Sequence, residues 1–115
     1  MRHELAKCFL DAAGACRAIC EFTAGKELAQ YKQDLLLRSA VERQFEILGE
    51  AFGRIDGLDA SFRIQVPEMG AIIGMRNRII HGYDSVDDSI VWDAVQRHVP
   101  RLTVWLKSGE NEPST

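Results

Sequence analysis

The stretch from residue 33 to about residue 55 restricts the fold more than any other part of the chain. Its apolar residues recur every three or four positions, which places them on or beside one face of an α-helix. These residues are Leu37, Val41, Phe45, Leu48, Phe52 and Ile55. Neither proline nor glycine interrupts the pattern before Gly49. A helix of this length must bury its apolar face against other elements.

A second helix is expected from residue 4 to about residue 23, since Thr23-Ala24-Gly25 is typical of a cap and a turn. Its apolar stripe consists of Leu5, Phe9, Ala12, Cys16 and Ile19. Residues 26–32 have room for one more short helical turn. Residues 56–66 contain Gly57, Asp59 and Ser61 and are expected to form a loop, with at most a short helical turn.

Pro67 suits the first position of another helix, where its missing N–H costs nothing. That helix is expected to bury Ile72, Met75 and Ile79 and to end near Ile80 or His81. Gly82 is expected to end it in the left-handed conformation that glycine adopts most readily.

A last helix is expected after Asp84, with Ser85 or Asp87 as its N-cap. Pro100 removes one backbone donor, so we expect a kink or a break near residues 96–99. The apolar face consists of Ile90, Val91, Ala94, Val95, Leu102, Trp105 and Leu106.

These patterns predict an all-α protein, an antiparallel bundle of four to five helices, because no segment alternates as a strand would. The chain has 115 residues, which suits one core. Residues 1–107 are expected to form this domain, and residues 108–115 a polar, frayed tail.

Composition excludes several classes of function. The formal net charge of −3 argues against a broad, non-specific nucleic-acid surface. No apolar run approaches the roughly 20 residues that span a bilayer. The first residues lack the apolar core of a signal peptide. We therefore expect a cytoplasmic protein with no membrane contact.

Cys8, Cys16 and Cys20 all lie in the first expected helix. Cys16 and Cys20 share a helix face at i, i+4 spacing and could bind a metal or a reactive partner. No second Cys or His pair completes a ligand set. We therefore interpret them as small core residues in a reducing compartment, and predict no metal and no cofactor.

Charged residues repeat every four positions on the polar face of the longest pattern: Arg38, Glu42, Glu46 and Glu50. One interpretation is a solvated face with intrahelical ion pairs, each worth little. The other is that some of these carboxylates orient arginines elsewhere in the fold or in a partner. The sequence leaves both open.

The residues with the richest chemistry lie together at positions 74–83: Gly-Met-Arg-Asn-Arg-Ile-Ile-His-Gly-Tyr. Each helical residue advances by about 100°. Arg76 and His81 would therefore point roughly 140° apart on an unbroken helix, whereas Asn77 and His81 would share a face. For Arg76 and His81 to act at one site, the helix must loosen near Gly82, or two copies of the chain must meet.

These residue types suit the cleavage of a phosphodiester. A histidine exchanges protons near neutral pH, and an arginine offers a planar fork for phosphate oxygens. In RNA the 2′-OH can act as the nucleophile, with His81 moving protons and Arg76 stabilising charge. The simpler alternative is that Arg76, Arg78 and His81 only complement the helix dipole. By itself, Tyr83 is more often a packed aromatic than a functional group.

The same stretch, followed by Val86-Asp87 and Ile90-Val91-Trp92, resembles the HepT-like proteins of the HEPN superfamily. Their signature is Arg-x4-His-x-Tyr, which Arg76, His81 and Tyr83 match. Residues 38–51 are similar to the long second helix of the family and residues 22–25 to its first turn. The resemblance extends to about residue 107. Asp84-Ser85 and the cysteine-rich first segment depart from the pattern outside the motif.

The resemblance implies an all-α homodimer whose paired motifs meet in a cleft. It implies the toxin of a prokaryotic, type VII-like toxin–antitoxin pair, acting as a metal-independent endoribonuclease. Arg76 and His81 would be catalytic, with Asn77 and Arg78 in support. The cognate antitoxin would be a nucleotidyltransferase that transfers AMP to Tyr83, and the added negative charge would exclude the phosphate of the RNA substrate.

The sequence is also compatible with two alternatives. The chain could be a binding subunit of a nucleotidyltransferase complex without nuclease activity. It could also be a helical dimerisation module, in which case replacing Arg76 or His81 would change neither toxicity nor partner binding.

Overall fold

The computed structural model describes residues 2–82 and 86–111, with side chains for residues 3–82 and 86–108. All regular structure in these ranges is α-helical, as the sequence predicts. The helices are α1 (Arg2–Thr23), α2 (Leu28–Gln33), α3 (Leu35–Leu58), α4 (Ser61–Gln65), α5 (Glu68–His81) and α6 (Asp88–Asn111).

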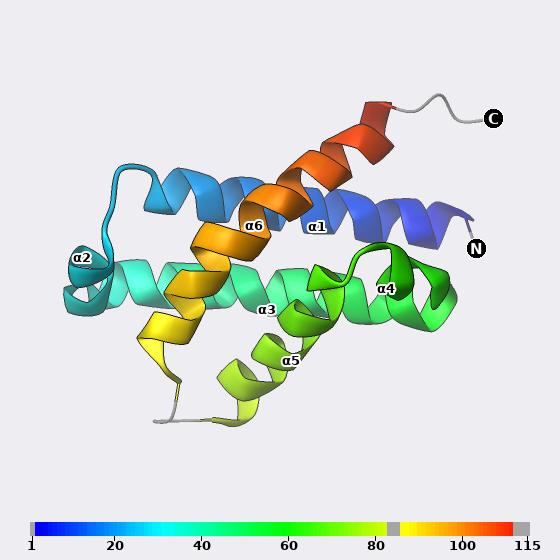
Figure 1. Ribbon diagram of the computed structural model, residues 1–115. Coiled ribbons are helices and arrows are strands. Elements are labelled where there is room, and N and C mark those ends of the chain that lie inside the picture. The colour runs from blue at the N-terminus through cyan, green and yellow to red at the C-terminus, as the bar shows by residue number, and fades with distance from the viewer. Residues whose placement is uncertain (1, 83–85, 112–115) are drawn as a thin grey trace.

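The two long helices α1 and α3 run antiparallel and form the base of the molecule (Figure 1). The short helix α2 lies in the turn between them, and α4 lies at the other end of α3. Helix α5 packs against α3, while α6 crosses the α1–α3 pair. This arrangement brings the helix that carries Arg76 and His81 directly onto α3.

The core forms where the predicted apolar stripes of α1, α3 and α6 meet. The whole α3 stripe is buried, with Phe45 and Phe52 fully enclosed, and so are Ile72 and Met75 of α5. Leu5 and Phe9 lie at the margin, where Phe9 makes an edge-to-face contact with Phe62 of α4. Burial of these stripes holds the helices together at about 25 cal/mol per Å² of apolar surface.

The structure describes six helices where the sequence predicts four to five, because α2 and α4 are helices in segments where at most short turns are expected. Other details of the prediction also differ from the structure. Ile90 is 44% exposed instead of buried, because its neighbours Val91 and Trp92 face the core. Of the kink or break expected near Pro100, the break is absent. Helix α6 continues to Asn111 because buried residues on both sides of the proline, Val99 and Leu102, hold it in the core. Gly82 is not left-handed, as described below.

Charged residues tie the N-terminal half of α3 to the start of α6. Asp34 caps α3 by accepting from the Leu37 amide at 3.0 Å. One turn later, the Arg38 Nε lies 3.9 Å from an oxygen of Asp88 on α6. Glu42 is half-buried in the same region. Its burial, followed by the nearby Asp88 carboxylate, raises the pKa of Glu42 above the ordinary 4.5, and Arg38 offsets part of this effect.

This shift predicts that Glu42 lowers stability as the pH rises. Above pH 4.5 and up to its raised pKa, the native state holds the Glu42 proton more tightly than the unfolded state, so the free energy of unfolding falls with increasing pH. We expect Glu42→Gln to raise Tm by about 2 °C at pH 7, a small gain because the group is partly solvated. The gain should vanish towards pH 4.5.

Thermal unfolding followed by circular dichroism between pH 4 and 8 checks this expectation. Glu21→Gln is the control, since it removes the same charge from an exposed position on α1. A Glu42→Gln gain that is equal at pH 4 and pH 7 would contradict the assignment.

No helix in the described ranges is both long enough and apolar enough to cross a membrane.

Candidate active site

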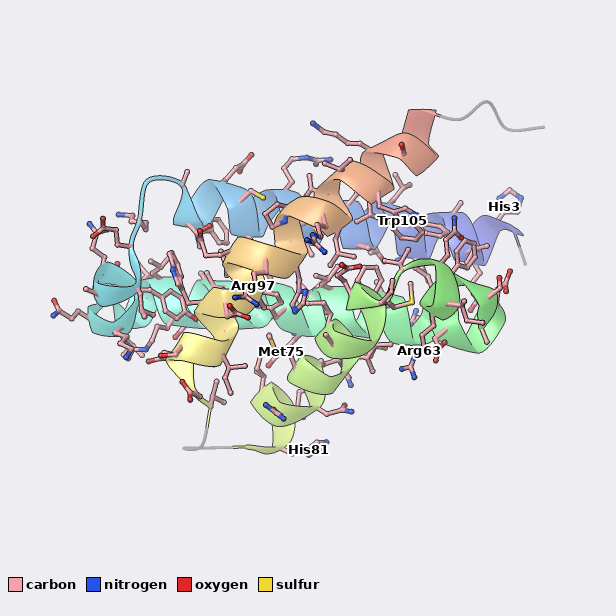
Figure 2. The ribbon with its side chains drawn as sticks, viewed as in Figure 1. His3, Arg63, Met75, His81, Arg97 and Trp105 are labelled. Atoms are coloured by element: carbon pink, nitrogen blue, oxygen red, sulfur yellow. The ribbon has the colours of Figure 1, made fainter. Side chains whose placement is uncertain are left out.

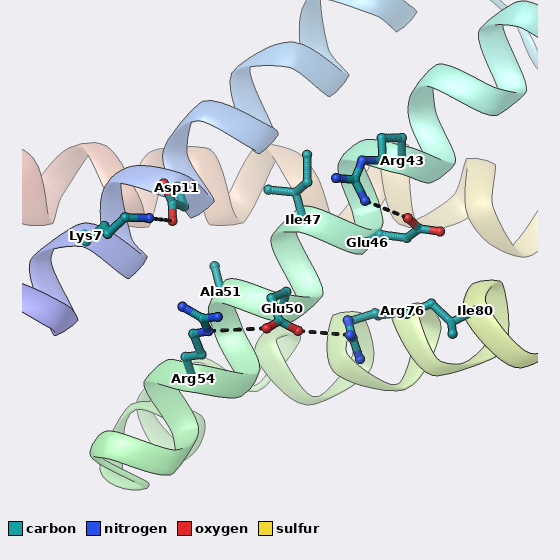
Figure 3. Close-up of a pocket in the computed structure, with 10 residues that line it drawn as sticks. All are labelled: Lys7, Asp11, Arg43, Glu46, Ile47, Glu50, Ala51, Arg54, Arg76 and Ile80. Carbon is teal, nitrogen blue, oxygen red and sulfur yellow. Dashed lines mark hydrogen bonds and ion pairs between the residues drawn. The ribbon is translucent and has the colours of Figure 1, made fainter.

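The side chain of Arg76 extends from α5 and lies against the backbone of α3 at Gly49. An ideal Cβ on Gly49 would lie 2.4 Å from the Cβ of Arg76. The guanidinium reaches Glu50, with Nη2 at 2.9 Å from Oε2 (Figure 3). The Nε is buried and has no hydrogen-bond partner among the described residues. The stem of Arg76 is therefore fixed by packing, while its charged end is directed to one carboxylate.

Glu50 is shared by two arginines. Its Oε1 accepts from the Nε of Arg54 at 3.3 Å, and its Oε2 pairs with Arg76. The side chain of Glu50 is 48% exposed and that of Arg76 29% exposed. Ion pairs this close to solvent contribute about 0–1 kcal/mol, so a phosphate oxygen can compete with Glu50 for the guanidinium. This contact confirms that a carboxylate of the α3 repeat orients an arginine from elsewhere in the fold.

Arg76 and Glu50 lie in an open pocket of about 460 Å³ formed by α1, α3 and α5 (Figure 3). Its charged lining residues are Lys7, Arg43, Arg54, Arg76, Asp11, Glu46 and Glu50. The first four are cationic and the other three anionic, so the lining carries one excess positive charge. Lys7 pairs with Asp11 and Arg43 with Glu46. Arg54 and Arg76 share the single carboxylate of Glu50, so one positive charge in the pocket is not neutralised. This excess charge favours the binding of an anion.

His81 lies in the last turn of α5, and its side chain is exposed at the edge of the molecule (Figure 2). The helix does not loosen there. Gly82 has a φ of −83° and donates its N–H to the carbonyl of Arg78 at 2.7 Å, a regular helical bond. The left-handed cap expected at Gly82 is wrong, because Gly82 keeps right-handed helical backbone angles and its N–H closes a last helical hydrogen bond.

The unbroken helix keeps Arg76 and His81 on different faces of α5, since five positions amount to a rotation of roughly 140°. Asn77 and Arg78 are exposed on the same helix. Within one chain, Arg76 faces the α3 pocket and His81 does not share that face. Of the two ways to combine these side chains at one site, the described residues do not show the first, a helix that loosens near Gly82.

Tyr83, which the family resemblance implies is the modified residue, lies outside the described residues, as does the alternative cap Ser85. Asp87 does cap α6, accepting from the Ser89 amide at 2.8 Å.

The cysteines take no part in this site. Cys8 and Cys16 are buried, as expected of core residues, whereas Cys20 is exposed. Burial raises the pKa of the Cys16 thiol to about 12, which keeps it protonated and poorly suited to bind a metal. In the part of the chain that the structure describes, no three His, Cys, Asp or Glu side chains are grouped to hold a metal ion.

Sequence comparison finds a family match that covers most of the chain. The HepT-like family, described as Ribonuclease HepT-like, matches residues 12–108. A relative from Methanocaldococcus jannaschii named "Putative RNase" is 31% identical over 84% of this chain and 88% of its own length. A "Probable ribonuclease HepT" from Thermococcus cleftensis is 33% identical over 80% of this chain and 83% of its own. No solved structure matches the chain significantly.

Proposed function

Because the chain belongs to the HepT-like ribonuclease family, we propose that it is an endoribonuclease whose active site is completed by a second copy. The observation that carries the proposal is the continuous helix α5, which directs Arg76 to the pocket and His81 to another face. A two-fold axis presents the same patch twice. In a dimer, His81 of one copy can then meet Arg76 of the other, although the two side chains of one copy lie on different faces.

The chemistry follows from the groups present. One His81 removes the proton from the 2′-OH of the RNA, and the 2′ oxygen attacks the adjacent phosphorus. The bond from phosphorus to the 5′ oxygen breaks, and the His81 of the second copy gives that oxygen a proton. The products are a 2′,3′-cyclic phosphate and a 5′-OH end. No redox partner is needed, and the histidines are restored by exchanging protons with water.

Arg76 stabilises the negative charge that builds up on the phosphorus centre. To do so it exchanges Glu50 for a phosphate oxygen, while Arg54 retains the Glu50 carboxylate. Asn77 orients His81 from one turn away on the same face. Arg78 is exposed and adds affinity for the RNA backbone. Since histidine and arginine supply the whole mechanism, the reaction is proposed to be metal-independent.

Purified protein should cleave RNA in the presence of EDTA at the rate seen in Mg²⁺. A substrate with a 2′-deoxy group at the cleavage position should not be cut, because it lacks the nucleophile. Mass spectrometry of the products should find the cyclic phosphate, and light scattering should find a dimer of the 12.9 kDa chain. Complete loss of activity in EDTA, or equal cleavage of the deoxy substrate, would refute this mechanism; an active monomer would refute the two-copy site.

The physiological role we propose is that of the toxin in a type VII-like pair, neutralised by a nucleotidyltransferase-type antitoxin. Tyr83 follows His81 by two positions. An AMP group on it would bring a bulky phosphate to the cleft and compete for Arg76. Intact mass after incubation with such a partner and ATP should show one added AMP per chain that is lost in Tyr83→Phe. An unchanged mass would remove this form of control.

A further inference from the structure

Helices α3 and α5 approach each other closely where Gly49 faces Arg76. An ideal Cβ at Gly49 would lie 2.4 Å from the Cβ, 2.8 Å from the Cδ and 3.0 Å from the Cγ of Arg76. Ordinary contacts between such atoms begin near 3.4 Å. The whole stem of Arg76 therefore lies on the bare backbone of α3, in space that any other residue at position 49 would occupy.

This contact cannot be relieved by a side-chain rotation alone. The nearest atom is the Cβ of Arg76, which is attached directly to the backbone of α5 and moves only with that helix. Two other glycines of α3, Gly53 and Gly57, would meet nothing within 4 Å. Glycine is unfavourable in the interior of a helix. Of these three glycines, only Gly49 makes room for a neighbouring side chain.

We propose that Gly49 is a positioning residue for Arg76. Its missing Cβ admits the stem of the arginine between the helices, and this depth allows the guanidinium to pair with Glu50, the next residue on α3. The buried Nε of Arg76 is a result of the same packing. The role in catalysis rests on the proposed ribonuclease function, whereas the role in placing Arg76 does not.

Gly49→Ala should displace α5 by about 1 Å, the difference between 2.4 Å and an ordinary contact. A displacement of about 1 Å at a reacting group can lower a rate about 100-fold. We therefore expect kcat for RNA cleavage to fall about 100-fold in the folded Gly49→Ala variant, with a smaller change in KM. Gly53→Ala, one turn later on the same helix, is the matched control and should retain the wild-type rate.

An NMR measurement follows Arg76 without any assay of activity. The Nε–Hε resonance of Arg76, assigned by its loss in Arg76→Lys, should shift in Gly49→Ala and stay in place in Gly53→Ala. A resonance and a kcat that are the same in both alanine variants would overturn the proposal. Should the wild-type chain fail to cleave RNA, the proposed function fails, and the resonance still decides the role of Gly49.

Combining variants separates positioning from a general loss of stability. In the Arg76→Gly background the Cβ that causes the clash is gone, so adding Gly49→Ala should raise Tm. In the Arg76→Ala background that Cβ is retained, so the same change should lower Tm. Adding Gly49→Ala to Arg76→Gly should also change kcat by less than about twofold, since coupled residues are not additive. An equal loss of Tm in both backgrounds would show that Gly49 does not act through Arg76.

Discussion

The His81→Ala variant should cleave RNA with a kcat about a hundred to ten thousand times lower than wild type. In the proposed dimer the change removes both the base that activates the 2′-OH and the acid that protonates the leaving oxygen. The imidazole is exposed at the end of α5, so the core is unchanged and Tm should stay within about 2–3 °C of wild type.

Single-turnover cleavage of an end-labelled RNA, in EDTA, measures this loss directly. His3→Ala is the control, because His3 is an exposed histidine near the start of α1 (Figure 2). A folded His81→Ala dimer that cuts as fast as the His3→Ala dimer would exclude His81 from the reaction.

Replacing Arg76 with alanine should lower kcat by about a hundred- to a thousand-fold, the usual effect of removing one donor that stabilises the transition state. Arg76→Lys should recover only part of the rate, because an ammonium keeps the charge but not the planar fork. Stability should change little through the ion pair itself, since the pair with Glu50 is partly solvated.

Arg97→Ala is a suitable control for Arg76→Ala. Arg97 lies on α6, is 76% exposed and pairs with Asp93 on its own helix, so its removal changes the net charge equally without touching the pocket. Cleavage rates should be compared at several salt concentrations, because lost charge also weakens RNA binding. Equal kcat values for the two variants at saturating RNA would contradict a role for Arg76 in the transition state.

The helices could be predicted because helical periodicity is a local property of the sequence. The stripes in α1 and α3 require only residues three and four positions apart, and the residues of both are buried or packed at the margin of the core. The continuity of α6 at Pro100 and the exposure of Ile90 do not follow from the local pattern. Whether a proline breaks a helix, and which of several adjacent apolar residues is buried, depends on packing from other parts of the chain.

The candidate site was predictable in its residue types but not in its geometry. The angle between Arg76 and His81 follows from the helix alone, yet the conformation of Gly82 was needed to exclude a break. The repeat of carboxylates on α3 indicated a partner arginine without identifying Glu50 or Arg76. Gly49 gave no local signal, because its role arises only when α5 packs on α3.

The continuity of α5 to His81 has a consequence in the cell that follows from mass action. In the proposed site, an isolated chain cannot cleave RNA, because its Arg76 and His81 lie on different faces of α5. At low abundance the concentration of the active dimer grows with the square of the chain concentration. A basal level of synthesis therefore produces very little RNA cleavage. A modest rise in expression, or degradation of a bound antitoxin, then raises the concentration of active dimer steeply.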